Sequence, residues 1–193
     1  MDLITGDGGI DFSANFNDQE ILATRLLLAQ ILYAIIMQKH DGTFIIKFFD
    51  TFTYPTIQLI YLLKRFYQDV CVCKPNTSRF ANSEKYIVCN KFKYADTHCF
   101  IEKFCTILDE IKNNEDYITS IININIPLQF LTCIEDCNIL LGKQEITTIN
   151  QTLQLMDIPK TNKINKFVKQ NLQKCVQWCS THHIPIYDDF VSS

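Results

Sequence analysis

Short runs of β-branched and aromatic residues alternate with longer apolar stretches through the first 93 residues, and this alternation limits the fold more than any other feature. The short runs are predicted strands, at 3–5, 43–49, 70–73 and 84–93. Helices are predicted at 17–39, where Asn17 and Glu20 suit a capping box, and at 55–68, where Pro55 suits the first turn. This order predicts an α/β fold with a mostly parallel sheet, in which the last two strands form an antiparallel edge pair.

Beyond residue 93 the apolar residues recur at helical spacing instead. Phe100 and Phe104 lie on one face of a predicted helix, and 163–179 is a predicted amphipathic helix. With 193 residues, of which 47% are hydrophobic and 20% charged, the chain can bury a sizeable core. We therefore expect residues 1–93 to form a sheet domain and residues 94–193 to form a mainly helical extension packed on it.

Charge and cysteine content restrict the class of protein. The formal net charge of −3 excludes a surface that is basic overall, as in an indiscriminate nucleic-acid binder, but allows a local basic groove. The most apolar stretch, 26–37, is shorter than the ~20 residues that cross a bilayer, so no membrane contact is expected. Nine cysteines, an odd number, without the N-terminal pattern of a signal peptide predict reduced, mostly buried thiols and a cytoplasmic location.

One group of cysteine and histidine residues near the C-terminus could suggest a metal site, formed by Cys175, Cys179, His182 and His183. Structural zinc sites more often combine closely spaced cysteine pairs from separate loops, whereas these residues follow one helix and its end. Buried cysteines on an amphipathic helix explain the pattern equally simply. We therefore predict no metal ion.

Three polar residues stand where an α/β fold binds its ligands, outside the carboxyl ends of the strands. Asp7 follows the first predicted strand, Lys47 lies near the end of the second, and Glu84 starts the last. If the last strand is antiparallel, all three converge at one end of the sheet. Each also has a simpler interpretation: a turn-forming aspartate, a lysine whose amine reaches solvent at a strand end, and a solvated edge residue. Together they predict a lysine held by carboxylates, which can anchor charge or accept a proton.

The loop before Glu84 carries Lys74, Ser78 and Arg79. These side chains fit an ordinary solvated loop. They also fit a set of phosphate contacts, which is the commonest role of Lys and Arg on a nucleic-acid surface. We expect Lys74 and Arg79 to contribute such contacts.

Three segments resemble successive motifs of one family. They are DLITGDGG at 2–9, TFIIKFFD at 43–50 and KPNTSRFANSEKY at 74–86, and their order and spacing agree from residue 2 to residue 93. The segments resemble the FtsJ-like ribose 2′-O-methyltransferases, and most closely the eukaryotic and viral branch that forms cap-1 on mRNA. The third segment is the most specific of the three.

The resemblance implies a Rossmann-like methyltransferase fold, S-adenosylmethionine as the cofactor, and RNA, in particular the capped 5′ end of mRNA, as the partner, with no role for DNA. The family uses a Lys-Asp-Lys-Glu tetrad, in which Asp7, Lys47 and Glu84 match the last three members. Lys47 would activate the ribose 2′-hydroxyl, Asp7 and Glu84 would orient it, and Asp7 and Gly8 would bind the cofactor. Acids alone raise the pKa of a lysine, so the first lysine of the tetrad would offset them.

The sequence departs from the family pattern upstream of Asp7. The family's first lysine and its glycine-rich cofactor loop should precede the strand that carries Asp7, but the given sequence starts at that strand. We therefore expect the C-terminal half of a methyltransferase, which binds cofactor negligibly by itself and needs a missing N-terminal half or a protein partner. The alternative is a non-catalytic remnant that binds RNA or a partner protein. The composition leads us to expect a viral source, with a location in the host cytoplasm or the virion.

Overall fold

The computed structural model describes the chain at 1–10, 18–113, 117–156 and 162–186. The chain divides into two compact units, 1–149 and 150–193, which are treated separately. The elements in chain order are β1 (Leu3–Gly6), α1 (Gln19–Met37), β2 (Thr43–Phe48), α2 (Tyr54–Phe66), β3 (Tyr67–Cys73), β4 (Lys85–Phe92), α3 (His98–Asn113), α4 (Leu128–Met156) and α5 (Asn162–Thr181).

The four strands form one sheet in the order β1-β2-β4-β3. β1 and β2 are parallel, joined through α1, whereas β4 runs antiparallel to both β2 and β3. Among the described strands β1, β2 and β3 therefore run in the same direction and β4 alone runs against them, which confirms the expectation of a mostly parallel sheet with an antiparallel pair at its end. What was not expected is the place of β4 between β2 and β3. β4 is reversed because the connection at 74–84 contains no crossover helix, which a parallel neighbour of β3 would need.

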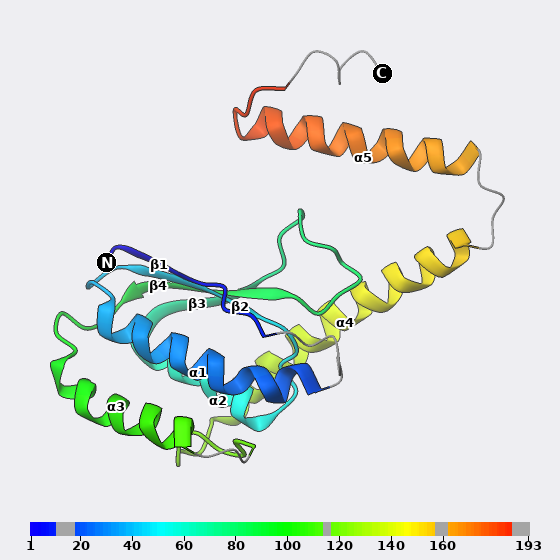
Figure 1. The fold of residues 1–193 in the computed structure, drawn as a ribbon. Coiled ribbons are helices and arrows are strands. Elements are labelled where there is room, and N and C mark those ends of the chain that lie inside the picture. The colour runs from blue at the N-terminus through cyan, green and yellow to red at the C-terminus, as the bar shows by residue number, and fades with distance from the viewer. Residues whose placement is uncertain (11–17, 114–116, 157–161, 187–193) are drawn as a thin grey trace. The chain divides into compact units, whose positions relative to one another are not determined.

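Residues paired across the strands share a face of the sheet, because successive side chains on a strand point to opposite sides. On the core face, Phe44 is paired with Ile4 and Cys89, and Ile46 with Ile87. These residues pack under α1 and α2, which lie on the same side of the sheet (Figure 1). The opposite face carries half-exposed residues, and we call it the open face: it includes Ile45 and Val88.

Among the described elements, helix α1 supplies the most buried apolar residues to this core. Its 19 residues are long and apolar enough to cross a membrane by length and composition alone, so the expectation of a stretch too short to do so is wrong. Half of its most apolar window is buried in the protein, and Ile31 and Ile35 are completely buried against the sheet. Burial of this kind is what a core helix requires.

Two predictions at helix ends are corrected by tertiary contacts. α2 ends at Phe66, so residues 67 and 68 belong to β3, where the buried Tyr67 pairs with Phe92 and donates a hydrogen bond to Gln38 (3.0 Å). Glu20 does not cap its own helix. Its carboxylate accepts hydrogen bonds from the Thr53 backbone N–H and hydroxyl, both at 2.8 Å, just before α2. Asn17 lies outside the described residues.

The helices beyond the sheet follow the predicted apolar spacing. In α3, Phe100 and Phe104 pack edge-on against Phe66, which places this helix on the core of the first unit. The sheet therefore packs with residues well beyond 93 in one compact unit that extends to 149. All nine cysteines are free, but Cys89 alone among them is buried, so the expectation of mostly buried thiols is wrong.

Candidate active site

The predicted convergence of Asp7, Lys47 and Glu84 follows from the observed topology. β1 and β2 are parallel, so Asp7 and Lys47 lie at the same edge of the sheet. β4 is antiparallel to β2, so its first residues, next to Glu84, lie at this edge as well. The Lys47 ammonium forms an ion pair with the Asp7 carboxylate. The Lys47 side chain is 18% exposed and that of Asp7 71% exposed, so the pair lies at the surface with its lysine mostly covered.

Glu84 lies immediately before β4, and its negative charge raises the pKa of Lys47. Its carboxylate accepts hydrogen bonds from the Ser78 hydroxyl (3.3 Å) and the Tyr86 hydroxyl (3.2 Å). Tyr86 is paired with Lys47 in the β2–β4 register and was not predicted as a site residue. The signal for it is its spacing: two residues after Glu84 on a strand, it must share that face.

The electrostatics of Lys47 follow from these neighbours. The hydrogen bond to Asp7 raises the pKa of Lys47, burial opposes this, and the charges of Asp7 and Glu84 raise the pKa further. The net direction is upward, as the flanking acids predict. Lys47 is therefore an ammonium at neutral pH, able to hold a negative or polar group. A second cation beside it would be needed to make it a base.

The loop residues Lys74 and Arg79, predicted together, behave differently. The Lys74 ammonium donates to Asn82 O (2.6 Å), Asn82 Oδ1 (2.9 Å) and Glu84 O (2.6 Å), and burial lowers its pKa. Lys74 thus holds the loop together, whereas Arg79 is exposed. Ser78 is directed to Glu84. Of these residues, Arg79 is the one placed to meet an external phosphate.

The turn after β1 is closed by α1. The Gly8 backbone N–H donates to Gln30 Oε1 (2.9 Å), and a Cβ at Gly8 would lie 2.9 Å from Gln30 Nε2, so a larger residue would displace the Gln30 side chain. A Cβ at Gly9 would meet no heavy atom within 4 Å. The exposed Asp7 carboxylate beside this open backbone suits a positively charged or hydrogen-bonding ligand. Within the described residues, no group of three potential metal ligands comes together.

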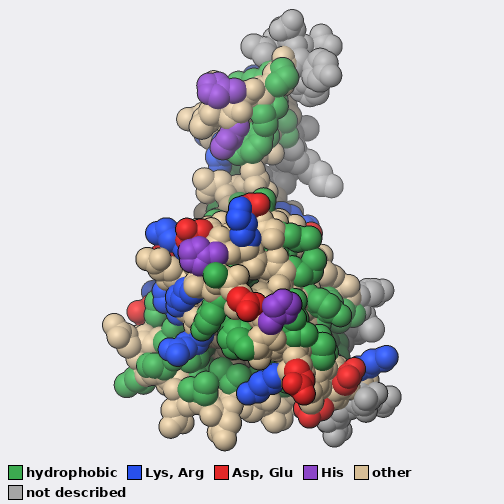
Figure 2. Space-filling model, turned by 90° about the vertical axis from the view of Figure 1, so that its left-hand side faces the viewer, with side chains coloured by type: hydrophobic (Ala, Val, Ile, Leu, Met, Phe, Trp, Pro, Cys, Tyr) green, Lys and Arg blue, Asp and Glu red, His purple; other side chains and the backbone are tan. Residues whose placement is uncertain are grey.

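The surface charge is mixed, in keeping with the net charge of −3. On the face shown in Figure 2, Lys and Arg side chains are interspersed with acidic and apolar ones instead of forming one basic patch. Any contact with a nucleic acid on this face would depend on a few local side chains.

Comparison with known proteins relates this site to a family. Residues 1–92 match the FtsJ-like methyltransferase family. The chain is similar to proteins named cap-specific mRNA (nucleoside-2′-O-)-methyltransferase 1 from Drosophila melanogaster (35% identity, 75% of this chain and 19% of the relative), Caenorhabditis elegans (38%; 60% and 13%) and Homo sapiens (37%; 66% and 15%).

The match confirms the expected fold class, a methyltransferase α/β fold with a helical C-terminal part. The chain spans less than a fifth of the length of these relatives, with 19% as the largest share. They are eukaryotic proteins, so they lend no support to the expected viral source.

Proposed function

Residues 1–92 belong to the FtsJ-like methyltransferase family, and from this premise we propose that the protein is an RNA ribose 2′-O-methyltransferase that acts on the capped 5′ end of mRNA. The single observation that carries the proposal is the meeting of Lys47 with Asp7 and Glu84 at one edge of the sheet, inside the matched segment. The names of the relatives support the mRNA cap as the substrate.

In this proposal Lys47 touches the ribose 2′-hydroxyl of the bound RNA. As an ammonium it orients the hydroxyl oxygen. Once a nearby positive charge lowers its pKa and it has released a proton to solvent, the neutral amine can accept the hydroxyl proton. Asp7 fixes the Lys47 amine through the ion pair, and Glu84, held by Ser78 and Tyr86, acts on the amine through its negative charge. Positioning supplies most of the rate enhancement, because the methyl donor is already activated.

S-adenosylmethionine would be held by Asp7 and Gly8 and would supply an electrophilic methyl group on a sulfonium. The exposed carboxylate of Asp7 complements a positive charge, and the open backbone at Gly9 leaves room beside it. Arg79 is the residue of the 74–84 loop that would contact RNA phosphates, because it is exposed while Lys74 is used within the loop.

Because the sequence predicts that residues 1–193 bind cofactor negligibly by themselves, the proposal is tested on these residues joined to the expected upstream segment. The measurement is transfer of a labelled methyl group from S-adenosylmethionine to capped RNA. Label should enter the first nucleotide after the cap. No label should be incorporated when that nucleotide already carries a 2′-O-methyl group. Lys91→Ala, at an exposed lysine of β4, is the control that should transfer normally. Binding of capped RNA without any methyl transfer would overturn the proposal and favour the non-catalytic alternative.

A further inference from the structure

A buried charge lies directly behind the candidate site. Lys85, the first residue of β4, is only 5% exposed and points to the core face, in phase with the buried Ile87 and Cys89. Its ammonium donates a hydrogen bond to the carbonyl oxygen of Phe49. Phe49 follows the end of β2, two residues after Lys47, so this bond ties the start of β4 to the end of β2.

The neighbouring residue on each strand strengthens the same connection. The Asp50 carboxylate accepts a hydrogen bond from the Ser83 side chain, and burial raises the pKa of Asp50. Ser83 and Lys85 flank Glu84 in sequence. Residues 49 and 50 therefore hold the residue before Glu84 and the residue after it, while the Lys74 ammonium holds the Glu84 carbonyl (2.6 Å).

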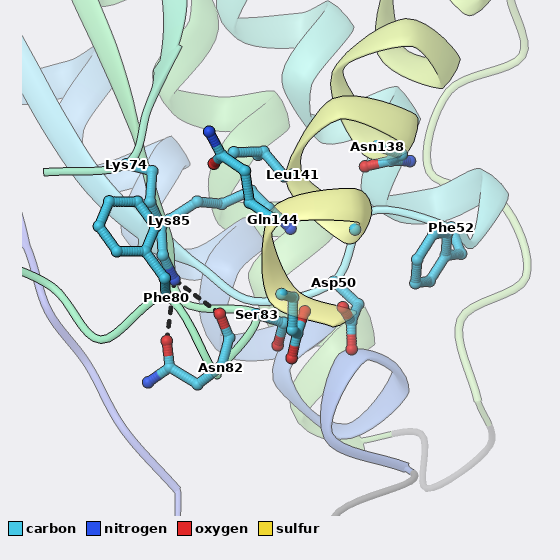
Figure 3. A pocket seen from close by; sticks show the side chains of 12 residues that line it. Asp50, Phe52, Lys74, Phe80, Asn82, Ser83, Lys85, Asn138, Leu141 and Gln144 are labelled. Carbon is cyan, nitrogen blue, oxygen red and sulfur yellow. Dashed lines mark hydrogen bonds between the residues drawn. The ribbon is translucent and has the colours of Figure 1, made fainter. Parts of the chain in front are cut away.

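Figure 3 shows the pocket in which these groups meet. Lys74 enters it from the end of β3, Lys85 from the start of β4, Asp50 and Phe52 from the loop after β2, and Asn138 from α4. Asn138 exchanges two hydrogen bonds with Thr51: its amide donates to Thr51 O (2.9 Å), and its Oδ1 accepts from the Thr51 hydroxyl (2.6 Å). The loop after Lys47 is thus held from β4 and from a helix outside the family match.

A buried lysine is a costly way to obtain stability alone. Removing an ammonium from water has a large cost in free energy. An apolar side chain packed in the same place would avoid this cost. The charges that face Lys85 are Asp50 after β2, Glu20 in α1 and Glu145 in α4, with Lys74 opposing them. Burial prevails over these acids and lowers the pKa of Lys85. What the lysine supplies that an apolar residue cannot is a directional hydrogen bond to the Phe49 carbonyl.

We propose that Lys85 is a positioning residue, which sets the spacing between the Lys47 amine and the Glu84 carboxylate by holding the start of β4 to the end of β2. The inference rests on the proposed function for its effect on catalysis, but the spacing itself is a property of the folded chain. Lys85 acts from the core face, so it touches neither substrate nor cofactor.

The test compares Lys85→Met with Lys85→Arg, and uses Lys91→Met, at an exposed lysine on the same strand, as the matched control. The pKa of Lys47 is measured by NMR in protein labelled at the lysine side chains. Loss of the Lys85 charge alone would raise the pKa of Lys47 slightly, whereas displacement of Glu84 lowers it. We expect the pKa of Lys47 to fall in Lys85→Met and to stay near the wild-type value in Lys85→Arg and Lys91→Met.

In methyl transfer, kcat should fall about 10- to 100-fold in Lys85→Met, the effect of a misplaced catalytic group, with little change in KM for RNA. If Lys85→Met does not fold, Asn138→Ala, which releases Thr51, is measured in the same way and should lower the pKa of Lys47 by a smaller amount. A folded variant with an unchanged or raised pKa of Lys47 would overturn the inference. A fall in that pKa in a protein without methyl transfer would instead uphold the inference and reject the proposed function.

Discussion

Two lysines one step apart in the β2–β4 register face opposite sides of one sheet, and their surroundings give them opposite properties. Lys47 is on the open face and pairs with Asp7, which raises its pKa. Lys85 is on the core face, where burial lowers its pKa. The open face thus keeps a lysine charged beside an acid, whereas on the core face a lysine makes a directional hydrogen bond to a backbone carbonyl. The same side chain performs either task, depending on which side of the strand it occupies.

The largest difference between the faces is expected in catalysis. In the proposed mechanism Lys47→Ala removes the group that would touch the ribose hydroxyl, and it should lower methyl transfer about 10²- to 10⁴-fold. The free energy of unfolding should change by no more than about 1 kcal/mol, because the ion pair with Asp7 lies at the surface. Methyl-transfer rates and urea denaturation of the same preparation measure the two effects. Activity within threefold of wild type would remove Lys47 from the mechanism.

For stability, the core face should be more sensitive to substitution than the open face. Ile46 is fully buried on the core face, and Ile46→Ala should lower the free energy of unfolding by about 2–5 kcal/mol. Ile45, its half-exposed neighbour on the open face, should lose no more than about 1.5 kcal/mol on the same change. Denaturant unfolding of the two variants provides the comparison. Equal losses would mean that the open face is as well covered as the core.

Lys74 and Arg79, the two cations of the 74–84 loop, should differ by a smaller amount in their effects on RNA binding and on stability. Arg79→Ala should weaken RNA binding a few-fold and reduce the slope of log affinity against log salt by about one phosphate contact. Lys74→Met should act mainly through loss of the bonds to Asn82 and Glu84, and so lower stability more than it changes the salt slope. Filter binding at several salt concentrations and thermal unfolding distinguish the two. An unchanged slope for Arg79→Ala would contradict this assignment.

The smallest effect is the pH dependence of stability in the alkaline range. The folded state raises the pKa of Lys47, so its stabilising contribution is complete below the ordinary value of 10.5 and is lost as pH rises through the folded pKa. The folded state lowers the pKa of Lys85, so its contribution increases as pH rises from that lowered pKa to 10.5. Relative to wild type, Lys47→Met should therefore lose less stability on raising the pH, and Lys85→Met should lose more. Parallel curves would show that neither lysine is perturbed.

The sequence predicted that Asp7 and Lys47 converge, but it did not predict the order of the strands around them. Asp7 and Lys47 were expected together because both follow from strand ends, a local pattern. The insertion of β4 between β2 and β3 depends on pairing between distant segments, which propensity does not encode. Glu20 shows the same limit: its spacing suits a cap for α1, but its partner, Thr53, comes from another element.

The buried position of Lys85 could have been predicted from the sequence. It alternates with Ile87 and Cys89, so the period of two that marks the buried face of β4 includes it. Charged residues are rarely fully buried, and for this reason the buried pattern is easily interpreted as starting at Ile87. The partner of Lys85 could not have been predicted, because the Phe49 carbonyl comes from a loop whose path is fixed by Thr51 and Asn138.

The strand order also determines when the site can form during synthesis. β3 leaves the ribosome before β4, yet its place in the sheet is beyond β4. A nascent chain that has exposed β1, β2 and β3 has two sheet edges and no strand to join them, and the pairing of residues this far apart is the slow part of folding. Lys47 and Glu84 therefore come together only after the chain has been synthesised past Phe92, the last residue of β4. Every shorter translation product lacks the assembled site.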